Sequence, residues 1–176
     1  MPDSEVLLIA SRFKVVREFQ STREGIRPRE IVRHPGAVVV LPLLEDGRVC
    51  LIRNYRISVK QTLIELPAGT LEPGEEPIQN AERELMEETG YRAAKLQQLH
   101  AFYLSPGILD ERMHLFLATG LTAGETAREA GEEIDNLVVP WEEAVQMAVD
   151  GRIHDAKSIV GLLLVDRMLK SGQLPR

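Results

Sequence analysis

The stretch GTLEPGEEPIQNAERELMEETGY, residues 69–91, decides most of what the sequence predicts about the fold. Pro77 suits the first turn of a helix, where a missing N–H costs nothing, and Gly90 suits the left-handed position just past a helix end. Between them, residues 78–89 contain no glycine or proline and are mostly strong helix formers. The stretch therefore predicts a loop that leads into a helix over residues 78–89.

The expected helix has two different faces. At 3.6 residues per turn, three apolar side chains form a stripe that can pack on a sheet, namely Ile78, Ala81 and Leu85. Glu84, Glu87 and Glu88 are related by i, i+3 and i+4, so their carboxylates converge on a neighbouring face. Like charges at this spacing destabilise a helix by about 0.2–0.5 kcal/mol per exposed pair. We therefore expect a cation to bind there.

Mg²⁺ is the cation that this pattern favours, because it prefers a few carboxylate oxygens, retained waters and substrate phosphates over a closed protein cage. Two or more such ions can polarise a phosphoryl group and activate water together. The three glutamates alone are also compatible with an ordinary solvent-facing acidic helix. Gly69, Glu75, Arg83 and Gly90 stand at fixed distances from them and favour the metal site, with Arg83 four residues before Glu87 and able to pair with it.

The composition predicts one globular domain with a small appendage, since the chain has 176 residues, of which 44% are hydrophobic and 27% charged. A net charge of −6 argues against a nucleic-acid partner. Residues 1–5 show no secretory signal, and the apolar runs are too short to span a membrane. Cys50, the single cysteine, is expected in the core and fits a cytoplasmic location. The four histidines lack zinc-ligand spacing.

Most of the remaining chain reads as strands. We expect two strands within 5–20, a polar connection at 21–28, a short strand at 29–33, a hairpin of 38–44 with 48–53 around Asp46 and Gly47, and strands at 63–66, 91–104, 111–121 and 136–140. Helices are expected from about 141 to 150 and from 155 to 169, the second with Asp155 as N-cap.

This order of elements predicts an α/β (α+β) fold with a mixed sheet and helices on both faces. Residues 1–35 form a separate β unit whose short strands cannot be stable alone, and residues 36–176 form the main domain. The first unit must therefore pack on the main domain or on a second subunit.

The spacing Gly-x5-Glu-x7-Arg-Glu-aliphatic-x-Glu-Glu-x-Gly, which starts at Gly69, resembles the signature of the Nudix hydrolases. These enzymes use divalent metals to cleave nucleoside diphosphates linked to another group. Further motifs resemble the ADP-ribose pyrophosphatase branch over about residues 29–165: YR at 55–56, ELPAG at 65–69, SPG at 105–107 followed by DE at 110–111, and DAK at 155–157. Tyr91 departs from the family, which usually has an aliphatic residue at this packing position. The resemblance implies an α/β/α sandwich.

The resemblance also implies a set of catalytic and metal-binding residues. Glu84 and Glu88 would bind two or more Mg²⁺ or Mn²⁺ ions, with Glu87 near them and the backbone carbonyl of Ala68 as a further ligand. Glu75 would brace the loop and helix through Arg83, which with Glu87 belongs to the catalytic set. A glutamate of the late loop at 122–135 would act as base or extra ligand; Glu132 and Glu133 are favoured over Glu129, and a solvated acidic loop is the alternative.

The implied substrate is a nucleoside diphosphate sugar, with ADP-ribose hydrolysed to AMP and ribose 5-phosphate. Arg56 would fork onto phosphate or stack on adenine, and an ion pair with Glu65 is the alternative. The other expected substrate-binding residues are Glu65, Arg29, Ser105, Gly107 and Glu111. A homodimer that exchanges N-terminal strands is implied as well. A GDP-mannose or UDP-sugar pyrophosphatase is the near alternative. A non-catalytic ADP-ribose sensor is remote, because all the carboxylates of the signature are present.

Overall fold

The central strand of the fold is β4 (Ala37–Pro42), whose side chains are all buried. The computed structural model describes residues 4–127 and 133–174. Along β4, Val38 and Val40 belong to one apolar cluster, while Val39 and Leu41 belong to another. Successive side chains of a strand point to opposite faces, so β4 separates two hydrophobic layers.

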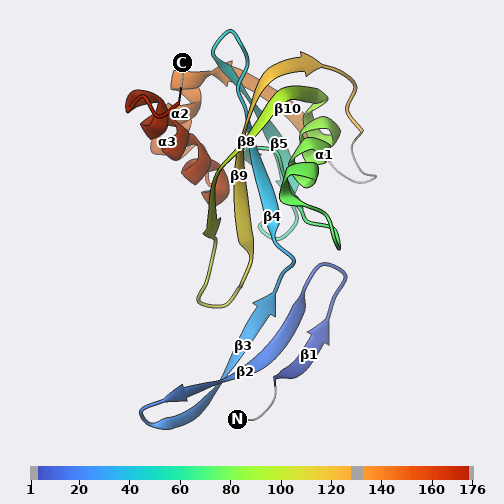
Figure 1. The fold of residues 1–176 in the computed structure, drawn as a ribbon, viewed down its shortest axis with the longest axis vertical. Coiled ribbons are helices and arrows are strands. Elements are labelled where there is room, and N and C mark those ends of the chain that lie inside the picture. Colours follow the sequence, from blue (N-terminus) through green and yellow to red (C-terminus); the bar gives the residue numbers. More distant parts are fainter. Residues whose placement is uncertain (1–3, 128–132, 175–176) are drawn as a thin grey trace.

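The main body contains two sheets with helices on both sides (Figure 1). One sheet has the order β7-β4-β9-β8 and includes β7 (Ala68–Thr70), β8 (Tyr91–Tyr103) and β9 (Arg112–Ala123). The other has the order β10-β5-β6 and consists of β10 (Ile134–Pro140), β5 (Arg48–Arg56) and β6 (Gln61–Glu65). Strand β4 pairs with β9 in parallel and with β7 antiparallel. Helix α1 (Pro77–Thr89) lies on one side, and α2 (Trp141–Val149) and α3 (Ala156–Lys170) lie on the other. The predicted fold class is confirmed.

Helix α1 begins and ends where the sequence predicts. Pro77 occupies the first turn, Glu76 and Gln79 form a capping box, and Gly90 adopts the left-handed conformation with φ of 78°. Ala81 and Leu85 are fully buried and pack with the β4 cluster. The prediction was wrong for Ile78, which is 51% exposed because it lies in the first turn, outside that cluster.

The predicted hairpin around Asp46 and Gly47 is confirmed as a turn but is wrong as a strand pair. Gly47 has a φ of 79°, and the Leu44 N–H donates to the Arg48 carbonyl at 2.8 Å. A single bridge, Leu43 with Val49, joins the two segments. Both edges of β4 are already occupied by β7 and β9, so β5 continues into the other sheet.

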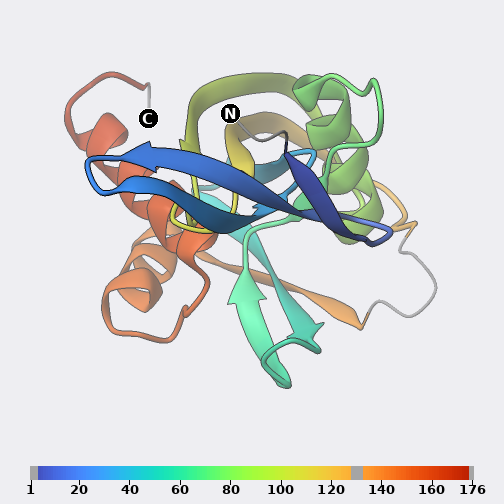
Figure 2. The ribbon, with the colours of Figure 1, turned by 90° about the horizontal axis from the view of Figure 1, so that it is seen from below.

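The N-terminal strands form a sheet of their own, in the order β1-β2-β3. It comprises β1 (Glu5–Ile9), β2 (Lys14–Thr22) and β3 (Gly25–Arg33), and it lies at one end of the main body (Figures 1 and 2). Residues 21–28, predicted as a polar connection, are instead part of a hairpin that turns between Thr22 and Gly25. Cross-strand pairing determines the strand conformation of this segment, because its own sequence has little apolar periodicity.

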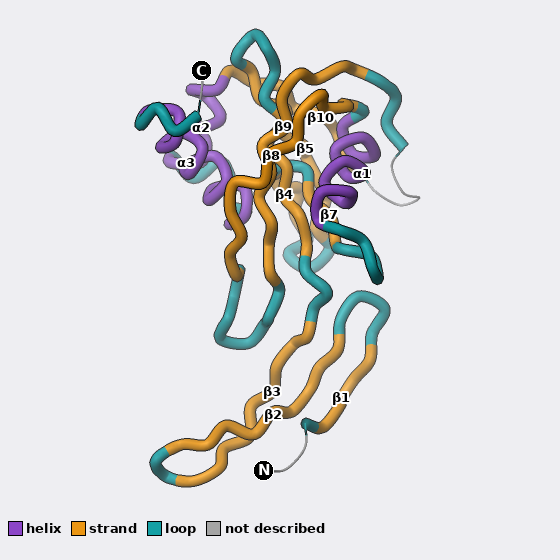
Figure 3. Tube along the Cα trace, in the orientation of Figure 1, coloured by secondary structure: helices purple, strands orange, loops and turns teal. Residues whose placement is uncertain are grey.

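One short contact region joins this sheet to the loop between β8 and β9. The Val32 N–H donates to the Ile108 carbonyl at 2.8 Å, and the Asp110 N–H donates to the Val32 carbonyl at 3.1 Å. Arg33 forms an ion pair with the Asp110 carboxylate at 2.9 Å. The tube trace in Figure 3 shows β3 continuing from this junction into β4.

Two further expectations are confirmed. Cys50 is fully buried on β5. Asp155 caps α3, because its carboxylate accepts a hydrogen bond from the Ser158 N–H at 3.0 Å. None of the described helices is long and apolar enough to cross a membrane.

Candidate functional site

A brace of polar side chains fixes the loop before α1 to the helix. The Arg83 Nε donates to Glu75 Oε1 at 3.0 Å, and Asn80 Nδ2 donates to Glu75 Oε2 at 2.7 Å. The same Asn80 nitrogen donates to the Thr70 carbonyl on β7 at 2.9 Å. The hydrogen bonds from Arg83 are the main cause that lowers the pKa of Glu75 to about 2. Glu75 therefore remains a carboxylate that holds loop, helix and strand together.

Two carboxylates of α1 lie directly over β7. The Glu88 Oε2 accepts a hydrogen bond from the Ala68 N–H at 2.9 Å, and Glu88 is only 3% exposed. The Glu84 carboxylate lies against Gly69, where an added β-carbon would come within 1.8 Å of Glu84 Oε1. Gly69 has no side chain, and this absence is what leaves room for Glu84.

These carboxylates open onto one hollow of about 360 Å³. Its lining residues come from five parts of the chain: Ser11, Arg12, Pro35, Arg56, Ala68, Gly69, Thr70, Leu71, Glu72, Pro73, Arg83, Glu84, Glu87 and Glu88. The structure thus brings together the predicted metal ligands, the predicted catalytic residue Arg83 and the predicted substrate residue Arg56.

The donor set of the hollow fits a divalent metal ion in its chemistry. Carboxylates at 84, 87 and 88 are the hard oxygen ligands that Mg²⁺ and Mn²⁺ prefer. Within residues 4–127 and 133–174, no three acidic, histidine or cysteine side chains are grouped around one point. Arg83 Nη1 lies 2.8 Å from Glu84 Oε1 and 2.9 Å from Glu87 Oε2. An ion and Arg83 would therefore compete for some of the same oxygens.

Arg56 forms the ion pair that the sequence left open as an alternative. Its Nε and Nη2 donate to the two oxygens of Glu65 at 2.8 and 2.6 Å, while Arg56 also lines the hollow. Glu65 is fully buried and accepts a further hydrogen bond from Lys157 Nζ at 2.7 Å. Burial acts to raise the pKa of Glu65, but the bonds from Arg56 and the charge of Lys157 outweigh it and keep that pKa below its usual range.

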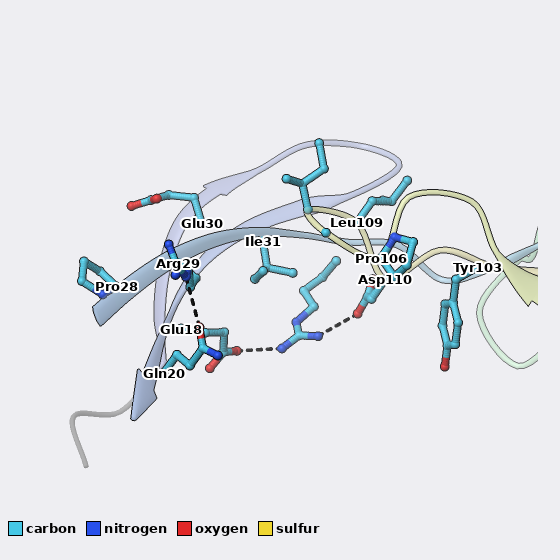
Figure 4. Close-up of a pocket in the computed structure, with 13 residues that line it drawn as sticks. Glu18, Gln20, Pro28, Arg29, Glu30, Ile31, Tyr103, Pro106, Leu109 and Asp110 are labelled. Atoms are coloured by element: carbon cyan, nitrogen blue, oxygen red, sulfur yellow. Dashed lines mark hydrogen bonds and ion pairs between the residues drawn. The ribbon is translucent and has the colours of Figure 1, made fainter. Parts of the chain in front are cut away.

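A second hollow of about 740 Å³, shown in Figure 4, is lined by two of the four remaining predicted substrate residues. Arg29 and Gly107 line it, and Arg29 Nε donates to Gln20 at 3.1 Å. The Ser105 carbonyl accepts from the Leu109 N–H at 2.9 Å and so shapes the adjoining turn. Glu111 lies 3.7 Å from His34 Nδ1. Arg33 lines this second hollow, and Pro35 lines the first. Both hollows therefore adjoin the connection between β3 and β4.

The late loop starts next to the end of α1. The Gly124 N–H donates to the Gly90 carbonyl at 2.8 Å, and the Ala127 N–H donates to the Glu87 carbonyl at 3.0 Å. Glu133 lines a different hollow, together with Arg53 and Tyr55. Glu129 and Glu132 lie outside the described residues.

Three residues of the site carried no role in the sequence interpretation. Asn80 belongs to the brace of Glu75. The sequence contained a signal for it, because asparagine is unfavourable in the interior of a helix and its presence there indicates a specific contact. Lys157 lies in the DAK motif but is joined to Glu65 only by the fold. Arg12 lines the first hollow from the N-terminal sheet, and nothing in the local sequence marks it.

Comparisons with known proteins agree with this architecture. The NUDIX domain profile matches residues 32–160. The ADP-ribose pyrophosphatase of Bacillus subtilis is 45% identical over 132 residues, which are 74% of this chain and 71% of that protein. A GDP-mannose pyrophosphatase of Klebsiella pneumoniae is 34% identical over 137 residues, 73% of this chain and 69% of that protein.

A solved structure supports the fold independently. The crystal structure of an ADP compounds hydrolase superposes with a TM-score of 0.82 at 24% identity, covering 97% of this chain and 93% of that one. Three glutamates of the first helix, Glu84, Glu87 and Glu88, line one hollow of this α/β/α sandwich, and the domain profile and the sequence relatives define the class of enzyme. The chain belongs to the Nudix family and is a Nudix hydrolase. Such enzymes generally use divalent metal ions.

Proposed function

We propose that this protein hydrolyses ADP-ribose to AMP and ribose 5-phosphate in the presence of Mg²⁺ or Mn²⁺, with two or more ions in each site. The observation that carries the proposal is the shared hollow, in which the glutamates of α1 lie together with the Arg56 guanidinium. Carboxylates there suit the ions, and a guanidinium suits the phosphates. The 45% identity to the Bacillus subtilis ADP-ribose pyrophosphatase supports the choice of substrate.

In this proposal the chain holds the ions through Glu84 and Glu88, with Glu87 beside them and the Ala68 carbonyl as a further donor. When bound, the ions would activate a water molecule and neutralise charge on the diphosphate. Arg83 orients Glu84 and Glu87, because its Nη1 lies within 2.9 Å of both. Gly69, Glu75 and Gly90 keep the strand, loop and helix end in the required geometry.

A glutamate of the late loop would accept the proton of the attacking water. Glu132 and Glu133 are the two candidates. Anchoring of residues 124 and 127 to the carbonyls at the end of α1 supports a loop that starts near the metal ligands. Glutamine substitution at each position, with kcat followed against pH, would identify the base through the loss of the acid limb.

The second hollow is proposed to take the nucleoside. Arg29 and Gly107 line it, Ser105 shapes the adjoining turn, and Glu111 follows Asp110 of its lining. Glu65 holds the Arg56 guanidinium, which lines the hollow of the metal ligands. A GDP-mannose pyrophosphatase would keep the same carboxylates and change only the contacts to base and sugar. The 34% identity to such an enzyme makes it the second candidate.

Residues 1–35 are proposed to serve as the dimerisation unit of a homodimer. Strand β1 supports this, because it forms a sheet edge and exposes apolar side chains at Val6, Leu8 and Ile9 by 55%, 52% and 70%. Light scattering that gives the mass of one 19.7 kDa chain would contradict the dimer.

A cytoplasmic location is proposed on the basis of the single, buried cysteine.

Product analysis tests the function directly. The protein is incubated with Mg²⁺ and either ADP-ribose or GDP-mannose, and the products are separated by chromatography. AMP and ribose 5-phosphate from ADP-ribose, at a higher kcat/KM than any turnover of GDP-mannose, is the expected result. A clear preference for GDP-mannose would replace the proposed substrate, and no turnover of either would overturn the proposal.

A further inference from the structure

The turn between β1 and β2 reaches the hollow that holds the glutamates of α1. Ser11 and Arg12 line that hollow together with Leu71, Glu72 and Pro73 of the loop before α1. The N-terminal sheet therefore contributes side chains to the site of its own chain.

The hollow is lined by guanidinium groups at Arg12, Arg56 and Arg83. Arg83 is committed to Glu75, Glu84 and Glu87. Arg56 directs two of its nitrogens at Glu65.

Arg12 differs from Arg56 and Arg83 in its side-chain contacts. Its side chain is exposed, and it makes no hydrogen bond or ion pair with any other residue in 4–127 or 133–174. Among the described residues, no partner takes its donors.

A guanidinium presents a planar fork of N–H donors that matches a phosphate in geometry and charge. An ion held by Glu84 and Glu88 would draw a diphosphate into the same hollow. A cation that lines the same hollow then faces negative charge from the substrate as well as from the protein. We propose that Arg12 is a substrate-binding residue that donates hydrogen bonds to the diphosphate, supplied by the N-terminal sheet to the site of its own chain. The inference rests on the proposed function in taking a nucleoside diphosphate as the ligand.

Arg23 provides a matched control. It lies in the turn between β2 and β3 of the same sheet and is also exposed. It lines none of the three hollows described above. Arg12→Gln and Arg23→Gln thus remove the same charge from the same sheet, and only the first removes it from the site. Arg12→Lys keeps the charge and loses the fork.

The test is calorimetric titration of ADP, in Mg²⁺, into the wild type and the three variants. Arg12→Gln should weaken ADP binding about tenfold, the change expected from the loss of one charge-assisted hydrogen bond. Arg12→Lys should fall between Arg12→Gln and the wild type, and Arg23→Gln should bind as the wild type does. With ADP-ribose as substrate, KM should rise by the same factor in Arg12→Gln while kcat stays within about twofold.

An ADP affinity of Arg12→Gln that equals those of the wild type and Arg23→Gln would overturn the inference, as would equal losses in both glutamine variants. Absence of ADP binding by the wild type would overturn it as well. The outcome is separable from that of the proposed function. A wild type that does not cleave ADP-ribose but loses ADP affinity on Arg12→Gln substitution would refute the substrate and keep the role of Arg12.

Discussion

The carboxylate of Glu84 occupies the place that a side chain at Gly69 would need. A β-carbon at position 69 would lie 1.8 Å from Glu84 Oε1 and 2.5 Å from Glu84 Cγ. Gly69 does not have a positive φ, so its importance is one of space and not of backbone conformation. This contact joins β7 to α1 at the proposed metal site.

Gly69→Ala should therefore lower kcat for ADP-ribose about a hundredfold, because Glu84 must move away from its position over β7. Steady-state kinetics would measure the change, and circular dichroism would check that the fold is kept. Gly151→Asn is the control, since Gly151 has open space around it and asparagine tolerates its φ of 82°. Equal activity of Gly69→Ala and the wild type would contradict the role given to this contact.

Glu84→Gln and Glu88→Gln should each reduce turnover by about a hundredfold or more, because an amide is a much weaker ligand for a hard cation than a carboxylate. Both variants should remain folded, since neither side chain is part of the apolar core. Glu82→Gln is the matched control on the same helix, where Glu82 is exposed. Wild-type turnover in either of the first two variants would remove that residue from the metal site.

Metal binding should raise the thermal stability of the wild type. A ligand that binds only the folded state stabilises it by about 2.7 kcal/mol at a hundredfold excess over Kd. Differential scanning fluorimetry with Mg²⁺ or Mn²⁺ would detect the upward shift in melting temperature. The shift should shrink in Glu88→Gln and persist in Glu82→Gln. A melting temperature that neither metal changes, even with ADP-ribose present, would argue against the site.

Glu75 should make the free energy of unfolding depend on pH in the acid range. Its pKa in the folded protein, about 2, lies below its ordinary value of 4.5, so the unfolded chain binds the proton more readily. The stabilisation is thus complete above about pH 4.5 and is lost as the pH falls towards about 2. Urea denaturation at about pH 3 and about pH 6 should show a smaller difference in Glu75→Gln than in the wild type. Glu82→Gln should keep the wild-type difference, and an unchanged difference in Glu75→Gln would contradict the brace.

Lys157→Met should destabilise the fold by about 3 kcal/mol, because it leaves the buried Glu65 with one of its two cations. Lys170→Met is the control on the same helix. Lys170 is 64% exposed and pairs with Asp166 at the surface, where such pairs contribute about 1 kcal/mol or less. Chemical denaturation measures both values. A loss in Lys157→Met no larger than that in Lys170→Met would show that Arg56 alone compensates Glu65.

The sequence by itself determined the helix α1 and the residues around it. Its start, its end and its acidic face depend on signals within about twenty residues, namely Pro77, Gly90 and the spacing of the glutamates. The pairing of Arg83 with Glu87 is also local, because it spans one helical turn. These features follow from backbone conformation and helix geometry, which neighbouring residues largely decide.

Only the tertiary structure decided how distant segments meet. The turn after Leu44 was predictable, but the division of β4 and β5 between two sheets depends on which strands occupy the edges of β4. Lys157 reaches Glu65 across 92 positions of sequence, and Arg12 reaches the hollow of Glu84 from a separate sheet. Contacts of this kind depend on how whole layers pack, which no short sequence pattern reports. They add Lys157 and Arg12 to the site whose first residues the local pattern of α1 indicated.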